Sequence, residues 1–163
     1  MAEHGGEAEE TTRQSPPRSR LYDYAGVNVT EKRYWVLTEV SLVIKGRDLH
    51  PEEITPFLAI EPTGVREPGP GKWDRPGEID GQWRISCDER RTRDFHEQLD
   101  SILSVAERKR TELRQLAEQG YEVTINLFGF SGNDSTLALH PEEIKRIALL
   151  GFPLRVAASM NER

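Results

Sequence analysis

The chain has 163 residues, a formal net charge of −6 and a single cysteine, Cys87. This length suits one domain with one hydrophobic core. The acidic balance argues against nucleic acids and anionic membranes as general partners, because both require a basic face. One cysteine excludes an intrachain disulfide and a cysteine-based zinc cluster. Since we find neither a run of about 18 apolar residues nor a basic, apolar leader, we expect a cytoplasmic protein.

The N-terminal segment is polar. Residues 1–20 contain no Val, Ile, Leu, Phe or Trp. Such a segment cannot bury enough apolar surface to offset the entropy lost on ordering. We therefore expect residues 1–33 to form a disordered tail and lead-in, and residues 34–160 to form a single domain.

A hexapeptide, Leu-His-Pro-Glu-Glu-Ile, occurs twice, at 49–54 and at 139–144. The first copy follows the clearest strand pattern, at 35–45, where apolar and polar residues alternate. Both copies predict a helix start, with proline in the first turn and two glutamates where the helix dipole favours negative charge. Pro56 removes a backbone donor soon afterwards, so we expect the first helix to be short or distorted.

The middle of the chain changes character twice. Residues 61–77 contain four prolines and four glycines, a composition that argues against regular structure. A strand is predicted at 82–87, and an amphipathic helix at about 93–119, where Gly120 would end it.

The last third of the chain predicts more strands. Alternation at 121–128, turn residues at 131–134 and two further leucines indicate a β-hairpin over 121–139. The second hexapeptide then begins a helix at 141–150, and a final strand is expected at 153–159.

The order β-α-β-α-β-β-α-β predicts an α+β fold. Alternation in every strand indicates a sheet with one buried face, hence an antiparallel or mixed sheet. We expect a two-layer sandwich with a mostly antiparallel sheet and helices on one face, ferredoxin-like in general plan.

Several short motifs, taken in order, resemble a known family. They are GRDLHPEEI at 46–54, LAIEPT at 58–63, QWRIS at 82–86, AEQGYEV at 117–123, SGN at 131–133 and LALHPEEI at 137–144. Over residues 38–157 the chain resembles the bacterial family catalogued as domain of unknown function 4279 (DUF4279). The resemblance implies a small α+β domain and brings no catalytic residues. Some small domains of this kind are suspected immunity proteins that neutralise toxins of competing bacteria.

The two repeated histidines are the most prominent candidate site. If His50 and His140 lay side by side, their imidazoles could bind a metal or an anion. We favour helix capping, in which each ring accepts a backbone N–H and Glu53 or Glu143 completes a capping box. A metal would need a third protein ligand, and the sequence does not indicate one. We therefore expect neither a metal nor another cofactor.

Cys87 could act as a nucleophile with His96 as its base. However, Cys87 shares its strand parity with Trp83 and Ile85, which favours core packing. We find no convincing catalytic constellation, so we lean towards a protein that is not an enzyme.

Two surfaces remain as candidate contact regions. The 61–79 loop offers cations and an aromatic plane that could hold a phosphate or a nucleotide. Its candidate residues, together with one on the next strand, are Arg66, Lys72, Trp73, Arg75 and Trp83. The exposed face of the sheet is expected to carry apolar residues that favour a protein contact, namely Trp35, Leu37, Val43, Phe128 and Phe130. Alternatively, residues 21–34 fold over them.

The leading hypothesis is therefore a non-enzymatic protein-binding module. A narrower version of it is an immunity-like protein that neutralises a bacterial toxin. Its partner would be another protein or a second copy of the chain, and we expect no membrane or nucleic acid. One alternative is a small-ligand binder or enzyme with a pocket at the 61–79 loop. The other is a structural homodimer.

Overall fold

The structure, a computed structural model, describes residues 35–70, 78–132 and 135–160. The unit that carries the fold is Lys32–Arg163. The predicted tail at 1–33 lies outside the described residues.

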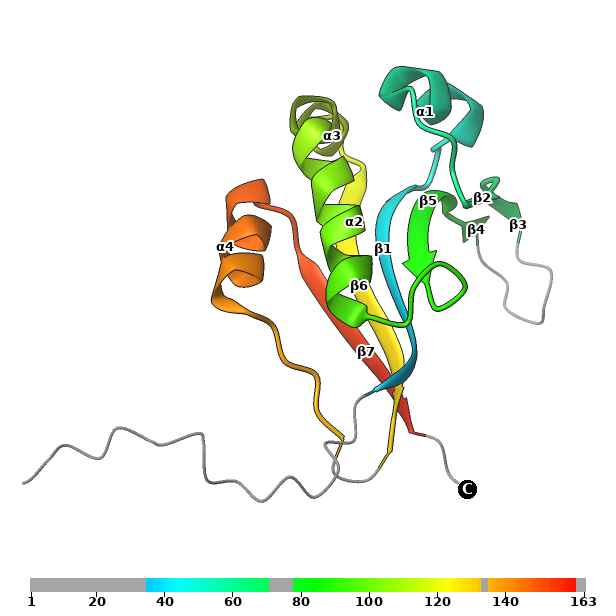
Figure 1. Cartoon of the computed structure of the whole chain (residues 1–163). Helices are drawn as coiled ribbons and strands as arrows, with labels where there is room; N and C mark the ends of the chain where they lie inside the picture. Colours follow the sequence, from blue (N-terminus) through cyan, green and yellow to red (C-terminus); the bar gives the residue numbers. More distant parts are fainter. Residues whose placement is uncertain (1–34, 71–77, 133–134, 161–163) are drawn as a thin grey trace, which may run out of the picture. The chain divides into compact units, whose positions relative to one another are not determined.

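A five-stranded mixed sheet forms one layer of the domain (Figure 1), with strand order β2-β5-β1-β6-β7. Its strands are β1 (Val36–Gly46), β2 (Gly64–Arg66), β5 (Gly81–Asp88), β6 (Glu122–Ser131) and β7 (Leu154–Met160). The central strand β1 pairs antiparallel with β5 and β6, and β2 pairs antiparallel with β5. Only β6 and β7 are parallel among these pairs. Two-residue strands β3 (Gly69–Pro70) and β4 (Glu78–Ile79) pair separately.

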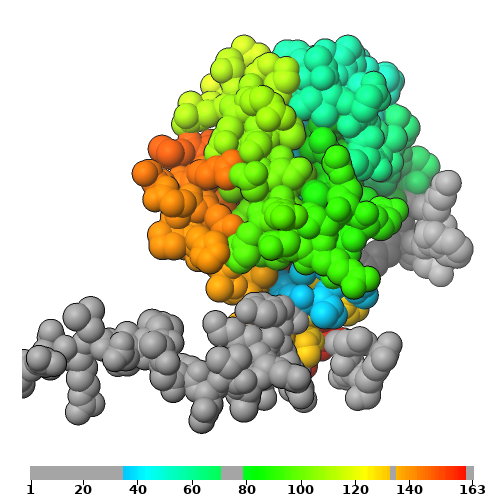
Figure 2. Space-filling view, in the orientation of Figure 1, coloured from blue at the N-terminus to red at the C-terminus, as the bar shows by residue number. Residues whose placement is uncertain are grey.

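The helices form the second layer. They are α1 (Pro51–Leu58), α2 (Phe95–Arg108), α3 (Arg110–Glu118) and α4 (Pro141–Leu150). All of them lie on the same side of the sheet, and Figure 2 shows this side, where α4, α2 with α3, and α1 close over the strands. The predicted two-layer α+β sandwich is confirmed.

Strand alternation explains where the core lies. Val40, Leu42 and Ile44 of β1 point towards the helices and are at most 1% exposed. Trp83 of β5 and Ile125 of β6 face the same way and are fully buried. Burying each such side chain contributes roughly 1.5–3 kcal/mol. The helical layer is therefore attached chiefly by this apolar face.

The predicted hairpin at 121–139 is wrong. Only β6 forms, and the described residues between its end and α4 contain a single isolated bridge, at Thr136. The edges of β6 are already occupied by β1 and β7, so no edge is left for a hairpin arm. Leu137 and Leu139 pack against the core instead, which accounts for their alternation without a strand.

The predicted helix at 93–119 is divided in two. Lys109, with φ −108° and ψ 18°, leaves helical geometry and separates α2 from α3. The apolar stripe continues across this break, because Ala106 before it and Leu113 after it are both fully buried.

The proline-rich loop also differs from expectation, since β2 and β3 form within residues 61–77. The first helix is short as expected, with eight residues, and it contains Pro56.

Candidate functional site

The sheet face opposite the helices carries a broad hollow. It has a volume of about 460 Å³ and extends across β5, β1, β6 and β7. Ser41 and Val43 are buried at its floor, beneath longer side chains. The charged residues that line it are Glu39, Lys45, Arg84 and Arg155.

This hollow is more basic than the chain as a whole, because three of its four charged residues are cations. Arg84 Nη1 donates to Glu39 Oε1 at 3.1 Å. Arg155 is paired with Glu122 on the neighbouring strand. The net charge of −6 is therefore not concentrated on this face.

One end of the open face carries apolar side chains among charged ones, which are Glu39, Asp88, Glu89 and Arg90. Phe128 and Phe130 pack edge to face with ring centroids 5.6 Å apart. Leu37 is 58% exposed and Phe128 39%, and all three residues line a second hollow of about 290 Å³. The two hollows share Glu39 and Phe128, so they form one continuous surface.

Trp35 does not lie on this face, contrary to expectation. A β-bulge shifts the register between Val36 and Glu39, and Leu37 adopts a left-handed conformation with φ 51°. Trp35 therefore packs on the helix side, where a Cβ added to Gly129 would lie 2.9 Å from its ring. The sequence pattern did not reveal the bulge, because strand parity assumes an unbroken strand.

The 61–79 loop gains little support as a ligand site. Arg66 is exposed, and its Nε donates to the carbonyl oxygen of Asp80 at 3.0 Å. Lys72, Trp73 and Arg75 lie outside the described residues. Trp83 as a contact residue is wrong, because its side chain is fully buried and its Nε1 donates to Thr55 Oγ1 at 3.1 Å.

The repeated histidines have different surroundings. His50 precedes α1, but its ring makes no capping hydrogen bond. The helix begins nonetheless, with the backbone N–H of Glu53 donating to the carbonyl of His50. His50 Nδ1 lies 3.6 Å from Glu67 and 3.9 Å from Glu52. His50 and His140 precede different helices, α1 and α4, which α2 and α3 separate in Figure 1, and they belong to different groups of neighbouring side chains.

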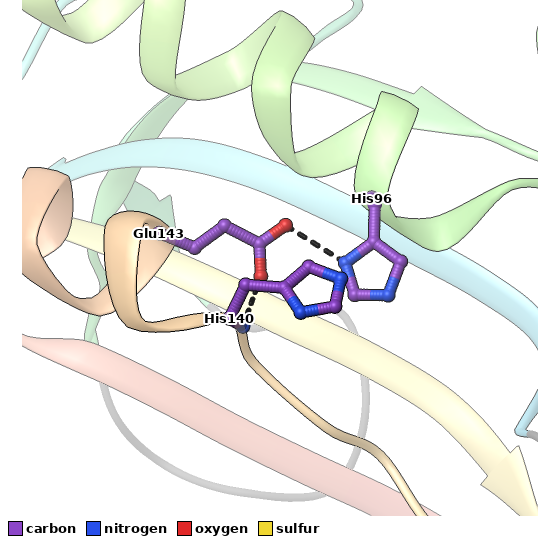
Figure 3. A group of neighbouring side chains, drawn as sticks. All are labelled: His96, His140 and Glu143. Carbon is purple, nitrogen blue, oxygen red and sulfur yellow. Dashed lines mark hydrogen bonds and ion pairs between the residues drawn. The ribbon is translucent and has the colours of Figure 1, made fainter.

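His140 instead meets His96. Their rings stack with centroids 4.2 Å apart and an interplanar angle of 24° (Figure 3). Glu143 joins the pair, because its Oε1 lies 2.7 Å from His96 Nδ1 and its Oε2 accepts from the His140 backbone N–H at 2.6 Å. The second of these bonds is the glutamate half of a capping box.

Sequence reasoning missed this cluster of His96, His140 and Glu143. Each histidine stands at the start of a helix, His96 just after the N-cap Asp94 and His140 at the N-cap itself. Nothing in the sequence shows that these two helix starts are neighbours. A cavity of about 350 Å³ lies beside His96, with Trp35, Phe95 and Leu137 in its lining.

Cys87 and His96 do not form a catalytic pair. The cysteine is 3% exposed and belongs to the core cluster, while Nδ1 of His96 is engaged with Glu143. These positions agree with the core-packing interpretation of Cys87.

Comparison with known proteins gives a family. A family model described as "Domain of unknown function (DUF4279)" matches residues 36–161. No curated protein and no solved structure matches the chain. Among the described residues no helix is long and apolar enough to cross a membrane. A function must therefore be inferred from the surfaces of this domain.

Proposed function

The chain belongs to the family of domain of unknown function DUF4279, whose model spans the domain, and we propose that it is a non-enzymatic protein-binding module. The observation that carries the proposal is the open face of the sheet. This face combines exposed apolar side chains with a basic hollow, and the helices lie on the opposite side.

The shape of this face favours a protein partner over a small ligand. Small molecules bind in concave sites that bury most of their surface. Here the two connected hollows extend from Leu37 at one end to Lys45 at the other end of β1. A flat protein surface can cover such an area, and exposed aromatic residues such as Phe128 are typical of interface centres.

The chemistry of the face defines the kind of partner. Phe128 and Leu37 would pack against apolar side chains of the partner. Arg84 and Arg155, which pair with Glu39 and Glu122, would exchange these glutamates for carboxylates of the partner. Such exposed charges chiefly increase the association rate and the selectivity of binding. The expected partner therefore presents an apolar patch opposite Phe128 and Leu37, and acidic residues opposite the hollow that Lys45, Arg84 and Arg155 line.

An immunity-like role is a narrower form of this proposal, in which the partner is a bacterial toxin met in the cytoplasm. The net charge of −6 would by itself suit a basic toxin. The cations around the hollow favour an acidic segment of such a toxin instead, if the open face is the one used.

Site-specific photo-cross-linking tests the proposal. A photoreactive phenylalanine analogue would replace Phe128 in one variant and Phe57 in another, in the full chain expressed in its native cells. Phe57 is a matched control, because it is 42% exposed, close to the 39% of Phe128, but belongs to α1. We expect a discrete cross-linked protein at position 128 only, and its loss on Arg84→Glu.

Three outcomes would contradict the proposal. Equal products at both positions would show non-specific contact. A product containing only two copies of this chain, with a dimeric mass in solution, would support the structural homodimer. A nucleotide or phosphorylated metabolite that raises the melting temperature, with the shift abolished by Arg84→Glu, would support the small-ligand alternative.

A further inference from the structure

We propose that His96, His140 and Glu143 form a binding site for a divalent transition metal of the zinc type, where the N-termini of α2 and α4 meet. This site lies in the helical layer and is independent of the open sheet face (Figure 3).

The distances suit a metal. One ligand atom from each of the three residues can be chosen so that all lie within 4.8 Å of one another. Bonds of about 2.0–2.1 Å to nitrogen and oxygen place neighbouring ligand atoms of a tetrahedral ion roughly 3.3 Å apart. The 2.7 Å between His96 Nδ1 and Glu143 Oε1 would have to widen slightly. Because the two rings are stacked with an interplanar angle of 24°, at least one imidazole would also have to rotate out of the stack before both nitrogens point at a common centre.

The donor set points to a particular class of ion. Imidazole nitrogen suits Zn²⁺ and its first-row neighbours, whereas Mg²⁺ and Ca²⁺ prefer oxygen ligands. Two histidines and one carboxylate are also the protein ligands of open zinc sites, in which water or a substrate occupies the remaining position. Of the three ligands, only His96 borders the cavity of about 350 Å³.

The ligands are held by the backbone of both helices. Asp94 Oδ1 accepts from the backbone N–H of His96 at 2.8 Å and fixes the start of α2. The backbone N–H of His140 holds the second oxygen of Glu143. Hydrogen bonds to ligating residues orient them and increase metal affinity. The cluster is therefore partly organised before any ion binds.

Helix dipoles act against a cation here, because the positive ends of α2 and α4 both point to the site. Acidic side chains in the first turns offset this effect, with Glu97 on α2 and Glu142 on α4. Glu143 itself contributes a charge directly to the ion. The simplest competing role is a hydrogen bond between His96 and Glu143 that only joins the two helices.

Titration of the full chain with Zn²⁺ by calorimetry tests the proposal, with Co²⁺ absorption as a second readout. We expect one equivalent to bind. His96→Ala, His140→Ala and Glu143→Gln should each weaken Zn²⁺ binding by about 100-fold or more, beyond the roughly 10–100-fold typical of residues that only orient ligands.

A matched control uses the remaining histidines of the chain. The sequence contains four, so the double variant His4→Ala/His50→Ala removes both that lie outside the site. It also disrupts the exposed group of His50, Glu52 and Glu67, the other described cluster with metal-ligand spacing. We expect this double variant to bind Zn²⁺ as the unmodified chain does.

His96→Asn separates metal binding from a structural role, because the asparagine amide can keep the hydrogen bond to Glu143 while coordinating a metal poorly. Zn²⁺ should raise the melting temperature of the unmodified chain and leave that of His96→Asn unchanged. The proposal is overturned if Zn²⁺ stabilises both equally, if the control variant loses binding, or if the unmodified chain binds no Zn²⁺.

Discussion

At the scale of single residues, Gly81 has the least room for a side chain among the described glycines. It pairs with Gly46 across β5 and β1. A Cβ at position 81 would lie 1.9 Å from the carbonyl oxygen of Leu49, which is closer than any nonbonded contact allows. Because the obstacle is backbone, it cannot rotate away as a side chain would.

We therefore expect Gly81→Ala to lower the free energy of unfolding by about 3 kcal/mol, at the upper end of typical overpacking costs. Urea denaturation measures this change. Gly132→Ala is the control, since nothing lies within 4 Å of its added Cβ, and it should change the stability by under about 0.5 kcal/mol. Equal effects of the two substitutions would show that the backbone at Leu49 can shift away from an added Cβ at position 81 at little cost in stability.

The histidines of the repeated hexapeptide show what can be predicted at this scale. Proline and the two glutamates specify a helix start, and both helices begin at the proline. The neighbours of each histidine come from distant parts of the chain, Glu67 for His50 and His96 for His140. Local sequence therefore predicts where the helices start. It cannot predict the cluster of His96, His140 and Glu143.

At the scale of elements, α4 is attached to the domain mainly by polar contacts. Only Ile147 and Leu150 of this helix are buried. Arg146 compensates by reaching α2, where it contacts Glu107 through Nε at 2.7 Å and Nη2 at 2.9 Å, and Asp100 at 2.6 Å. A bidentate arginine–carboxylate pair with a second acid is stronger than a single surface ion pair.

We expect Arg146→Met to destabilise the protein by about 1 kcal/mol at neutral pH, a value that allows for solvent screening. Hydrogen exchange of the α4 amides should accelerate more than that of β1, because α4 would open locally. Lys145→Met is the control, since Lys145 is 68% exposed and its contact with Glu142 is 3.8 Å long.

The pH dependence of this effect follows from Glu107. Its hydrogen bond with Arg146 lowers the pKa of Glu107 below the usual 4.5. A carboxylate with a lowered pKa stabilises the folded state above its unfolded pKa and loses that contribution as the pH falls through its folded pKa. The difference between Arg146→Met and the unmodified chain should therefore shrink below about pH 4.5. A difference that stays constant to pH 3 would contradict this origin.

The sequence predicted those helices and strands that local residue pattern determines. It missed those features that depend on contacts with elements distant in the chain. Alternation located β1, β5 and β7, and the turn and capping residues located the helices. The hairpin after β6 failed because β7 had taken the free edge of β6. The break at Lys109 could not be predicted, because no proline or glycine lies near it in the sequence.

At the scale of the whole molecule, the two proposed sites occupy opposite sides of one sheet. The two connected hollows lie on the open face. The cluster of His96, His140 and Glu143 lies among the helices. Helix packing buries one face of the sheet and leaves the other free for a partner. A change at one site can thus be made without disturbing the residues of the other.

The open face also leads to a prediction about the N-terminal residues. If this face receives a partner, residues 1–31 are not needed to cover it. Removing them leaves the unit that carries the fold, so we expect a change in melting temperature of under about 2 °C, which corresponds to less than about 1 kcal/mol for a domain of this size. A fall of many degrees, with new binding of a hydrophobic dye that Phe128→Asp abolishes, would show that the N-terminal residues cover the face themselves. That result would remove the surface on which the protein-binding proposal depends.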